Sequence, residues 1–140
     1  RLVRRVAAKR NTYQSSPLQT QSIIETVGHL LPKTPEEVEK VSADLGYKNL
    51  PLANQKSYTL VKGRDTPQTP GGYQGRAGLY EVMEVTEEIQ QLIIKHATSH
   101  EVQKVAMAQG MITMRQDGYL KALTGITTLE EVNRVASDSA

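Results

Sequence analysis

The sequence predicts an α+β fold that is mostly helical. A small antiparallel β subdomain with a helical insertion is followed by a C-terminal compact group of about four helices. Three observations lead to this prediction. Helix-start patterns, a Ser or Thr followed three residues later by Glu or Gln, recur along the chain. Stripes of apolar residues at helical spacing follow them. Two short segments have the composition of strands. The length of 140 residues fits one domain core or two small ones.

The helix starts are the strongest local signals. In a capping box, the two side chains satisfy backbone N–H groups at the helix end, and proline suits the first helical position. Thr86 is a simpler cap, followed by two acidic residues that favour the positive end of the helix dipole. The predicted capping boxes are Ser16 with Gln19, Thr34 with Glu37, Thr98 with Glu101, and Thr128 with Glu131.

Each predicted helix also has an expected end. The helix after Ser16 is expected to end by Pro32, and the one after Thr34 just before Gly46. A helix after Thr86 precedes the one that starts at Thr98. The helix that starts at Thr98 is expected to end at Gly110. A further helix is expected over Met114 to Leu123, with its end at Gly125, and a last helix follows Thr128.

Two segments are predicted to be extended. Ser57 to Lys62 is rich in strand-forming residues, and Ala77 to Val85 alternates apolar and polar side chains. A loop rich in Pro, Gly and Thr separates them. We therefore predict two subdomains: residues 1–85, which mix helices with a small antiparallel sheet, and residues 86–140, which form the helical group.

Composition excludes several classes of site. The chain has no cysteine, so it has neither disulfides nor thiolate zinc ligands. No apolar run approaches the roughly 18 residues that span a bilayer. His96 and His100 are four residues apart, but the helix start at Thr98 separates them, so we predict no metal site. The opening RLVRRVAAKR reads as the middle of a longer protein. We expect its basic residues to form a solvated face, with Leu2, Val3 and Val6 turned inward. A nucleic-acid patch is the alternative.

The segment GGYQGRAGLYEVMEV, residues 71–85, contains Gly72, Gly75 and Gly78 around Arg76. It lacks the Gly-Lys-Ser/Thr ending of a phosphate-binding P-loop, and it leads into a predicted strand instead of a helix. We interpret it as a turn into a strand. From the residues alone, Arg76 is a candidate partner for an anion or a carboxylate, and it would pair with Glu81 only if the segment folds back.

Two runs of residues resemble the C-terminal end of the bacterial type II secretion and type IV pilus assembly ATPases. The first run follows the pattern Gly-Tyr-x-Gly-Arg-x-Gly with a strand ending in Glu and a following Thr, and the second follows R-x-D-G-x-x-K-x-x-x-G-I-T-T-L-E-E-V. The resemblance is close over 71–136, moderate over 1–10 and loose between them. The matching residues are Gly72, Tyr73, Gly75, Arg76, Gly78, Glu81, Thr86, Arg115, Asp117, Gly118, Lys121 and the run from Gly125 to Val132.

The chain departs from this family at one expected metal site. The resemblance implies a four-cysteine zinc site, and the corresponding positions here are approximately Ala7, Arg10, Asp65 and Gln68. None can supply a thiolate. We therefore expect a variant without the zinc, in which the helical stretch 17–45 and the strand 57–62 take over the metal's stabilising role.

The resemblance implies a hexameric motor at the cytoplasmic face of the inner membrane. Such a motor hydrolyses ATP with Mg²⁺ and drives pilin or pseudopilin extrusion through an inner-membrane platform protein. The family's Walker motifs are expected upstream of Arg1. This chain is then the non-catalytic C-terminal module, with no cofactor or metal of its own. It would contact its own ATPase core and neighbouring subunits, and nucleic acid is not an expected partner.

With this resemblance, Arg76 and Glu81 are expected to be a structural or interface pair. The residues expected to have structural or interface roles are Gly75, Arg76, Gly78, Glu81, Arg115, Asp117, Gly118, Thr128 and Glu131. The alternative function is a free-standing helical adaptor or nucleic-acid-binding module that uses the basic start of the chain.

Overall fold

The computed structural model describes residues 1–137 and confirms the α+β fold class with a helical C-terminal group. The strands are β1 (Leu2–Val6), β2 (Arg10–Gln14), β3 (Thr59–Gly63) and β4 (Tyr73–Gly78). The α-helices are α1 (Pro17–Val27), α2 (Val38–Asp44), α3 (Glu87–Ile94), α4 (Ser99–Ala108), α5 (Met114–Leu123) and α6 (Leu129–Ala136). Two 3₁₀ turns are η1 (Pro35–Glu37) and η2 (Pro70–Gly72). No helix in residues 1–137 is both long and apolar enough to cross a membrane.

Four strands form two antiparallel pairs, β1 with β4 and β2 with β3. β1 and β2 were not individually predicted, because their sequences are largely polar and basic. Within β1, Val3 and Val6 are buried, as expected, but Leu2 is 56% exposed. Neighbouring side chains of a strand point to opposite faces, so Leu2 and Val3 cannot both face the core.

The strand predicted at residues 77–85 lies earlier in the chain. β4 ends at Gly78, and Leu79 still exchanges backbone hydrogen bonds with Arg1. Residues 80–86 form a connector that belongs to no strand pair within residues 1–137. The alternation of apolar and polar residues therefore does not mark a half-buried strand here. Leu79 is buried in the core, but Val82 is 79% exposed and Tyr80 is 67% exposed, so the alternating residues after Leu79 do not cover a core.

One hydrophobic core joins the two ends of the chain. Val3 of β1 and Leu79 after β4 lie in the same buried cluster as Tyr119 of α5 and Val132 of α6. Residues of α1 and β3, such as Ile23 and Leu60, complete it. The structure thus packs α5 and α6 with elements of residues 1–79.

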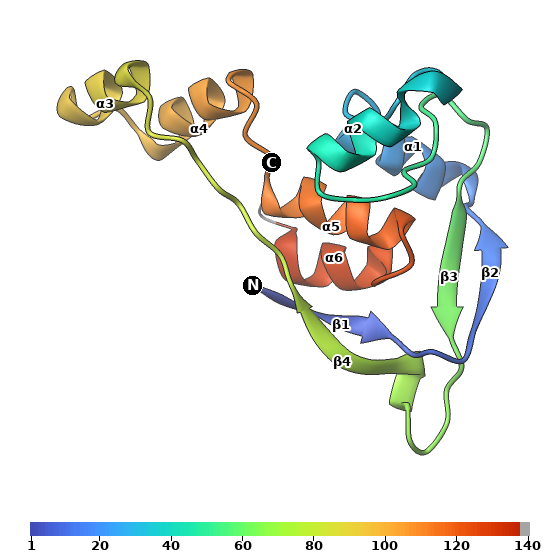
Figure 1. Ribbon diagram of the computed structural model, residues 1–140. Coiled ribbons are helices and arrows are strands. Elements are labelled where there is room, and N and C mark those ends of the chain that lie inside the picture. The colour runs from blue at the N-terminus through green and yellow to red at the C-terminus, as the bar shows by residue number, and fades with distance from the viewer. Residues whose placement is uncertain (138–140) are drawn as a thin grey trace.

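The four C-terminal helices form two pairs instead of one compact group. α5 packs on α6, and this pair also contacts α1 and β1. α3 packs on α4, and Figure 1 shows this pair projecting away from the body of the molecule. We call residues 80–112, which hold the connector, α3 and α4, the arm. The predicted boundary between residues 85 and 86 remains a prediction, and it lies inside the arm.

Helix capping follows the sequence at most positions. The predicted boxes Ser16–Gln19 and Thr98–Glu101 are both complete, and Thr86 caps α3. The prediction at Thr34 is wrong, because its side chain makes no capping bond and Glu37 accepts from the Lys33 N–H instead. Residues 35–37 form a 3₁₀ turn there. A further box, Thr113 with Gln116, starts α5 and was not predicted.

We predict that Gly118→Ala destabilises the protein. A Cβ at Gly118 would lie 2.5 Å from Cγ1 and 3.2 Å from Cβ of Val132, where α5 crosses α6. Overpacking of this kind costs about 1–3 kcal/mol, which outweighs the roughly 1 kcal/mol that alanine gains over glycine in a helix. Equilibrium urea unfolding measures the change.

The control for this prediction is the same substitution made in a Val132→Ala background. There the two methyl groups that meet the new Cβ are gone, so Gly118→Ala is expected to be neutral or favourable. An equal cost in both backgrounds would show that the close approach of α5 and α6 does not explain the glycine.

Candidate functional site

The two segments that carry the family pattern, residues 72–86 and 115–132, lie close together in the fold. β4 lies beside β1, and α6 contacts β1 from the other side. The connector after β4 passes the N-terminal end of α5, where Glu81 reaches Met114. The family-typical residues therefore gather at two places: around Glu131 of α6 and around Asp117 of α5.

Glu131 is the centre of the first place. Its side chain is 2% exposed, and both carboxylate oxygens accept hydrogen bonds. The backbone N–H of Arg4 donates to Oε2 at 2.9 Å, and the Arg4 guanidinium donates to Oε1. Arg134 adds a two-bond contact from Nε and Nη2, each at 3.0 Å. We call Arg4, Glu131 and Arg134 the Glu131 anchor.

The anchor keeps Glu131 ionised. Burial opposes the charge of the Glu131 carboxylate, but hydrogen bonds from Arg4 and Arg134 more than compensate, and its pKa falls from 4.5 to about 2. The same contact raises the pKa of the Arg4 guanidinium. Paired charge-assisted bonds to a planar guanidinium are among the strong polar contacts in proteins. The anchor therefore fixes α6 against β1.

Thr128 and Tyr73 extend the anchor towards β4. The Thr128 hydroxyl caps α6 by accepting from the Glu131 N–H. The predicted box is half formed, because the Glu131 carboxylate turns to Arg4 instead of the Thr128 backbone. Thr128 Oγ1 also lies 2.8 Å from the Tyr73 hydroxyl, and the Arg4 guanidinium stacks over the Tyr73 ring at 4.2 Å. One cluster thus joins β1, β4 and α6.

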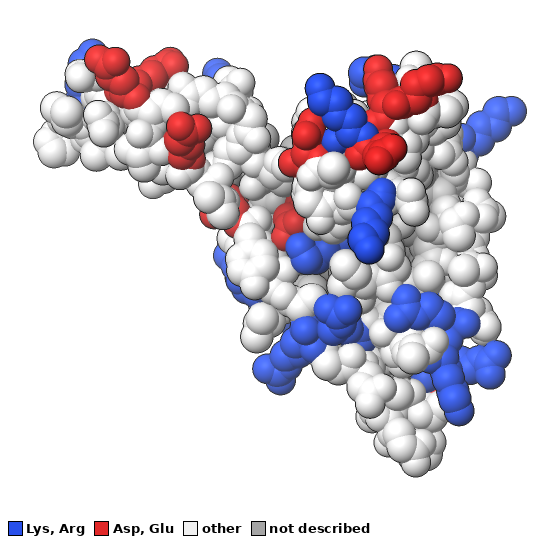
Figure 2. All heavy atoms as spheres, viewed as in Figure 1, with Lys and Arg blue, Asp and Glu red and all other residues white. Residues whose placement is uncertain are grey.

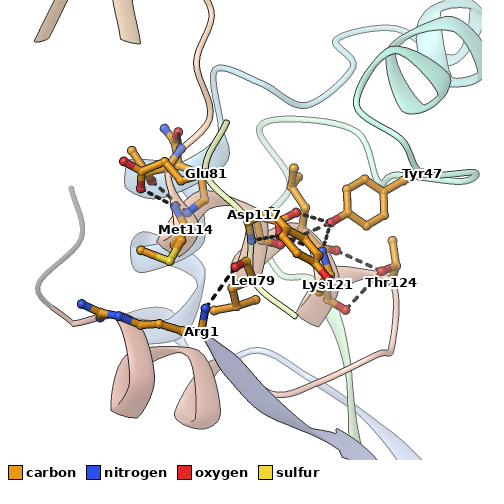
Figure 3. Close-up of polar contacts among 12 residues, drawn as sticks. Arg1, Tyr47, Leu79, Glu81, Met114, Asp117, Lys121 and Thr124 are labelled. Atoms are coloured by element: carbon orange, nitrogen blue, oxygen red, sulfur yellow. Dashed lines mark hydrogen bonds and ion pairs between the residues drawn. The ribbon is translucent and has the colours of Figure 1, made fainter. Parts of the chain in front are cut away.

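Asp117 is the centre of the second place (Figure 3). Its Oδ1 accepts from the Tyr47 hydroxyl at 2.6 Å, and its Oδ2 accepts from Lys121 Nζ at 2.7 Å. Oδ2 also accepts from the Tyr80 N–H at 3.1 Å. Burial and the neighbouring carboxylate together raise the pKa of the Tyr47 hydroxyl, so it remains a donor. Asp117 thereby ties α5 to the segment after α2 and to the first residue of the arm.

Glu81 makes a second attachment of the arm. Its Oε2 accepts from the Met114 N–H at the start of α5, at 3.1 Å. The predicted pair of Arg76 with Glu81 is not formed, since no hydrogen bond or ion pair joins them within residues 1–137. Arg76 lies on the exposed side of β4, opposite Arg4 of β1. The Asp117–Tyr80 and Glu81–Met114 contacts form the base of the arm.

The remaining predicted residues have local structural roles. Gly75 has φ of +80° where the β1–β4 register shifts, and a glycine suits this bulge. At Gly78 an added Cβ would meet the Tyr80 hydroxyl at 2.5 Å. The Arg115 guanidinium lies 5.4 Å from the centre of the Tyr119 ring and donates to its hydroxyl. Whether any of these positions contacts another subunit remains a prediction.

Comparison with known proteins agrees with the motifs. Residues 5–134 match the family described as "Type II/IV secretion system protein". The chain belongs to this family. It is 46% identical over 67 residues to the type IV pilus assembly ATPase PilB of Pseudomonas aeruginosa, covering 48% of the chain and 12% of that protein. It is 40% identical over 107 residues to PilB of Acinetobacter baylyi, covering 76% and 18%.

A third relative is a secretion system protein. Type II secretion system protein E of Xanthomonas campestris is 36% identical over 106 residues, which cover 76% of the chain and 18% of that protein. The chain therefore spans less than a fifth of the length of the relatives it matches. The chain is thus similar both to pilus assembly proteins and to a secretion protein.

The positions of the implied zinc site do not fit a metal in this family member. The Arg10 guanidinium donates to the carbonyls of Val6, Ala7 and Gly125, so a cation already lies there. Asp65 accepts from the Gly71 N–H at 3.0 Å. No group of three His, Cys, Asp or Glu side chains in the described chain could hold a metal ion. Arg10 and Asp65 thus hold the loop ends with hydrogen bonds.

Five residues of these two clusters were not identified as site residues from the sequence, namely Arg4, Tyr47, Tyr73, Lys121 and Arg134. Arg134 follows Glu131 by three positions, and Lys121 follows Asp117 by four; both are ion-pair spacings that could have indicated them. Arg4 and Tyr47 contact residues 127 and 70 positions away. No local pattern identifies such long-range partners.

We predict that Glu131→Gln lowers the free energy of unfolding at pH 7 by about 2–4 kcal/mol, because it breaks a buried ionic contact while leaving its partners in place. Glu130→Gln is the matched control, since the neighbouring Glu130 is exposed on the same helix turn. Its effect is expected to stay within about 0.5 kcal/mol. Equal effects of the two substitutions would contradict the anchor.

The pKa of Glu131 also predicts a pH dependence. A carboxyl whose folded pKa is lowered from 4.5 to about 2 stabilises the fold fully above pH 4.5, and this stability disappears as the pH falls towards 2. The difference in unfolding free energy between wild type and Glu131→Gln should therefore close over this range. A difference that is constant from pH 7 to pH 2 would contradict the ionised, paired carboxylate.

We predict that Asp117→Ala loosens the base of the arm. The Tyr80 N–H then loses its acceptor, and Lys121, which is 15% exposed, loses its ion pair. Amide hydrogen exchange at Tyr80 should become faster than in the wild type. Glu84→Ala, on the exposed connector, is the control and should leave this amide unchanged. Unchanged exchange at Tyr80 in Asp117→Ala would mean that other contacts hold the arm.

Proposed function

We propose that this chain is the C-terminal, non-catalytic part of a hexameric ATP-hydrolysing motor. The motor powers type IV pilus assembly or type II secretion at the cytoplasmic face of the inner membrane. ATP and Mg²⁺ bind in other parts of the full-length protein. This part braces the ATPase core and contributes contacts to neighbouring subunits and to an inner-membrane platform protein.

The Glu131 anchor carries this proposal. Residues of the family pattern, Thr128 and Glu131, form hydrogen bonds with Tyr73 and Arg4. Asp117, from the same pattern, bonds the backbone of the arm. These side chains are used to hold strands and helices together. A part built in this way is suited to transmit force between elements, since buried and fully bonded networks are rigid.

The relatives support the motor assignment by their names. The PilB proteins of Pseudomonas aeruginosa and Acinetobacter baylyi are named type IV pilus assembly ATPases, and the Xanthomonas campestris relative is named type II secretion system protein E. The sequence of this chain has no Gly-x-x-x-x-Gly-Lys-Ser/Thr segment, the loop that binds ATP phosphates. The proposed division of labour assigns nucleotide chemistry to the rest of the protein and bracing to these residues.

The test compares the 140-residue chain with the full-length protein encoded by its gene. We expect ATP binding and hydrolysis in the full-length protein and neither in the 140-residue chain. Within the full-length protein, Glu131→Gln should lower both the hexamer fraction, measured by light scattering, and the ATPase rate. Glu130→Gln should change neither.

Two results would contradict the proposal. ATP hydrolysis by the 140-residue chain would place catalytic groups within it. Normal assembly and hydrolysis by a full-length Glu131→Gln protein, in which the 140-residue part is shown to be destabilised, would mean that this part does not brace the motor.

A further inference from the structure

The arm is poorly covered by its own chain. Of its residues 80–112, only Ile89 and Ala106 are buried. Several large apolar side chains are more than half exposed: Tyr80, Val82, Val85, Ile93 and Ile94. A short helical pair that buries so little apolar surface has little stabilisation of its own. The arm therefore exposes an apolar surface of the kind that a binding partner covers.

A groove runs along the arm. It has a volume of about 840 Å³ and lies between the connector and the facing sides of α3 and α4. Met83, Ile93, Val102 and Met111 give it apolar walls. Exposed methionines and aliphatic residues in one groove are typical of protein-binding surfaces.

The arm is also acidic. Residues 80–112 contain five glutamates and two lysines, a net charge of −3. Glu84 and Glu87 are exposed, and within residues 1–137 neither side chain makes a hydrogen bond or an ion pair. These two glutamates lie beside the groove and do not line it. A partner of the arm is therefore favoured if it carries positive charge, because complementary charge steers association.

The strands of the same chain supply such a positively charged surface. Residues 1–14 and 59–78, which hold the four strands, contain eight Lys and Arg and a single acid, Asp65, a net charge of +7. Figure 2 shows basic side chains and no acidic ones at the lower end of the molecule, whereas acidic side chains lie with further basic ones on the arm and the upper part. We call the exposed side chains of Arg5, Lys9, Lys62, Arg64 and Arg76 the basic end.

The basic end forms one surface. The Arg64 N–H donates to the Lys9 carbonyl, and Lys62 lies beside Asn11 in the β2–β3 register. Arg76 pairs with Arg4 across β1 and β4, and the Arg5 stem lies against Gly75. The exposed Leu2 and the partly exposed Tyr73 and Val61 add apolar area to these strands.

We propose that the arm of one copy docks on the basic end of a second copy. Within one chain, α3 and α4 of the arm project away from the strands that carry the basic end (Figure 1), so these helices do not cover it. The near-neutral total charge of +2 conceals this polarity. A contact between two different surfaces of identical chains is head-to-tail, and repetition of it closes a ring or extends a filament. This inference rests on the proposed function, because the contact would be the one between neighbouring subunits of the motor.

Charge reversal tests the contact directly with the 140-residue chain. The arm variant carries Glu84→Lys and Glu87→Lys, and the basic-end variant carries Arg64→Glu and Arg76→Glu. We expect wild type to associate in sedimentation velocity at 50 mM salt and more weakly at 500 mM. Each variant alone should lose at least about tenfold in association constant, because one charge set then repels the other.

Mixing the two variants restores attraction in both directions, so the mixture should associate about as strongly as wild type. The matched control carries Glu36→Lys and Glu39→Lys, which reverse exposed acids beside and within α2, outside both surfaces. It should associate like wild type. Circular dichroism confirms that each variant is folded.

The proposal is overturned by a wild-type chain that stays monomeric, by single variants that associate like wild type, or by a mixture that fails to recover. Salt-sensitive binding of duplex DNA by a monomeric chain, lost in the basic-end variant, would assign the basic end to nucleic acid instead. These measurements need no ATP. Failure of self-association therefore stays distinct from failure of the motor assignment, which the ATPase comparison decides.

Discussion

The carboxylate of Glu131 lies inside the protein between two arginines that come from opposite ends of the chain. Arg4 reaches it from β1 with both its backbone and its side chain, and Arg134 reaches it from the next turn of α6. Burial of a charge is unfavourable unless all of its acceptor positions are used, and here both oxygens are used. The position of α6 against β1 follows from this contact. The alignment of β4, through Tyr73, and of α5, through Val132, follows in turn.

The second cluster, around Asp117, attaches the arm to this part of the fold. Asp117 lies on α5, which packs on α6, and it holds the first backbone N–H of the arm. Glu81 holds the arm a second time, at the start of α5. Beyond these contacts the arm has little cover from the body of the protein, with Ile89 and Ala106 as its buried residues. The result is a rigid body that presents a lightly attached acidic arm on one side and a basic sheet surface on another. In the proposed motor, such a part would brace the ATPase core and contact a neighbouring subunit at the same time.

The sequence predicted local features better than long-range ones. Ser16, Thr98 and Thr86 could be identified as caps because each bonds a backbone group three residues away. The α5 bounds, Met114–Leu123, also agree with the prediction, which used the expected stop at Gly125 and not the cap. The strand expected at residues 77–85 was wrong because alternation shows which side chains could share a face, but not whether a partner strand exists. Glu131 was identified through the family pattern, whereas its partner Arg4 was not, since no spacing rule connects residues 127 positions apart. The separation of α3 and α4 from α5 and α6 depends on tertiary packing and has no local signal.

A double-mutant cycle between Arg4 and Glu131 tests the central role of the anchor most directly. The unfolding free energies of wild type, Arg4→Met, Glu131→Gln and the double variant give the coupling between the two side chains, free of their separate effects. Arg4→Met removes the guanidinium but leaves the hydrogen bond from the residue 4 backbone N–H to the Glu131 carboxylate in place. We expect a coupling of about 1–3 kcal/mol at pH 7, well above that of an exposed surface ion pair. A coupling indistinguishable from zero would show that the two ends of the chain are held together by packing alone, and that the anchor is not what the rest of the structure depends on.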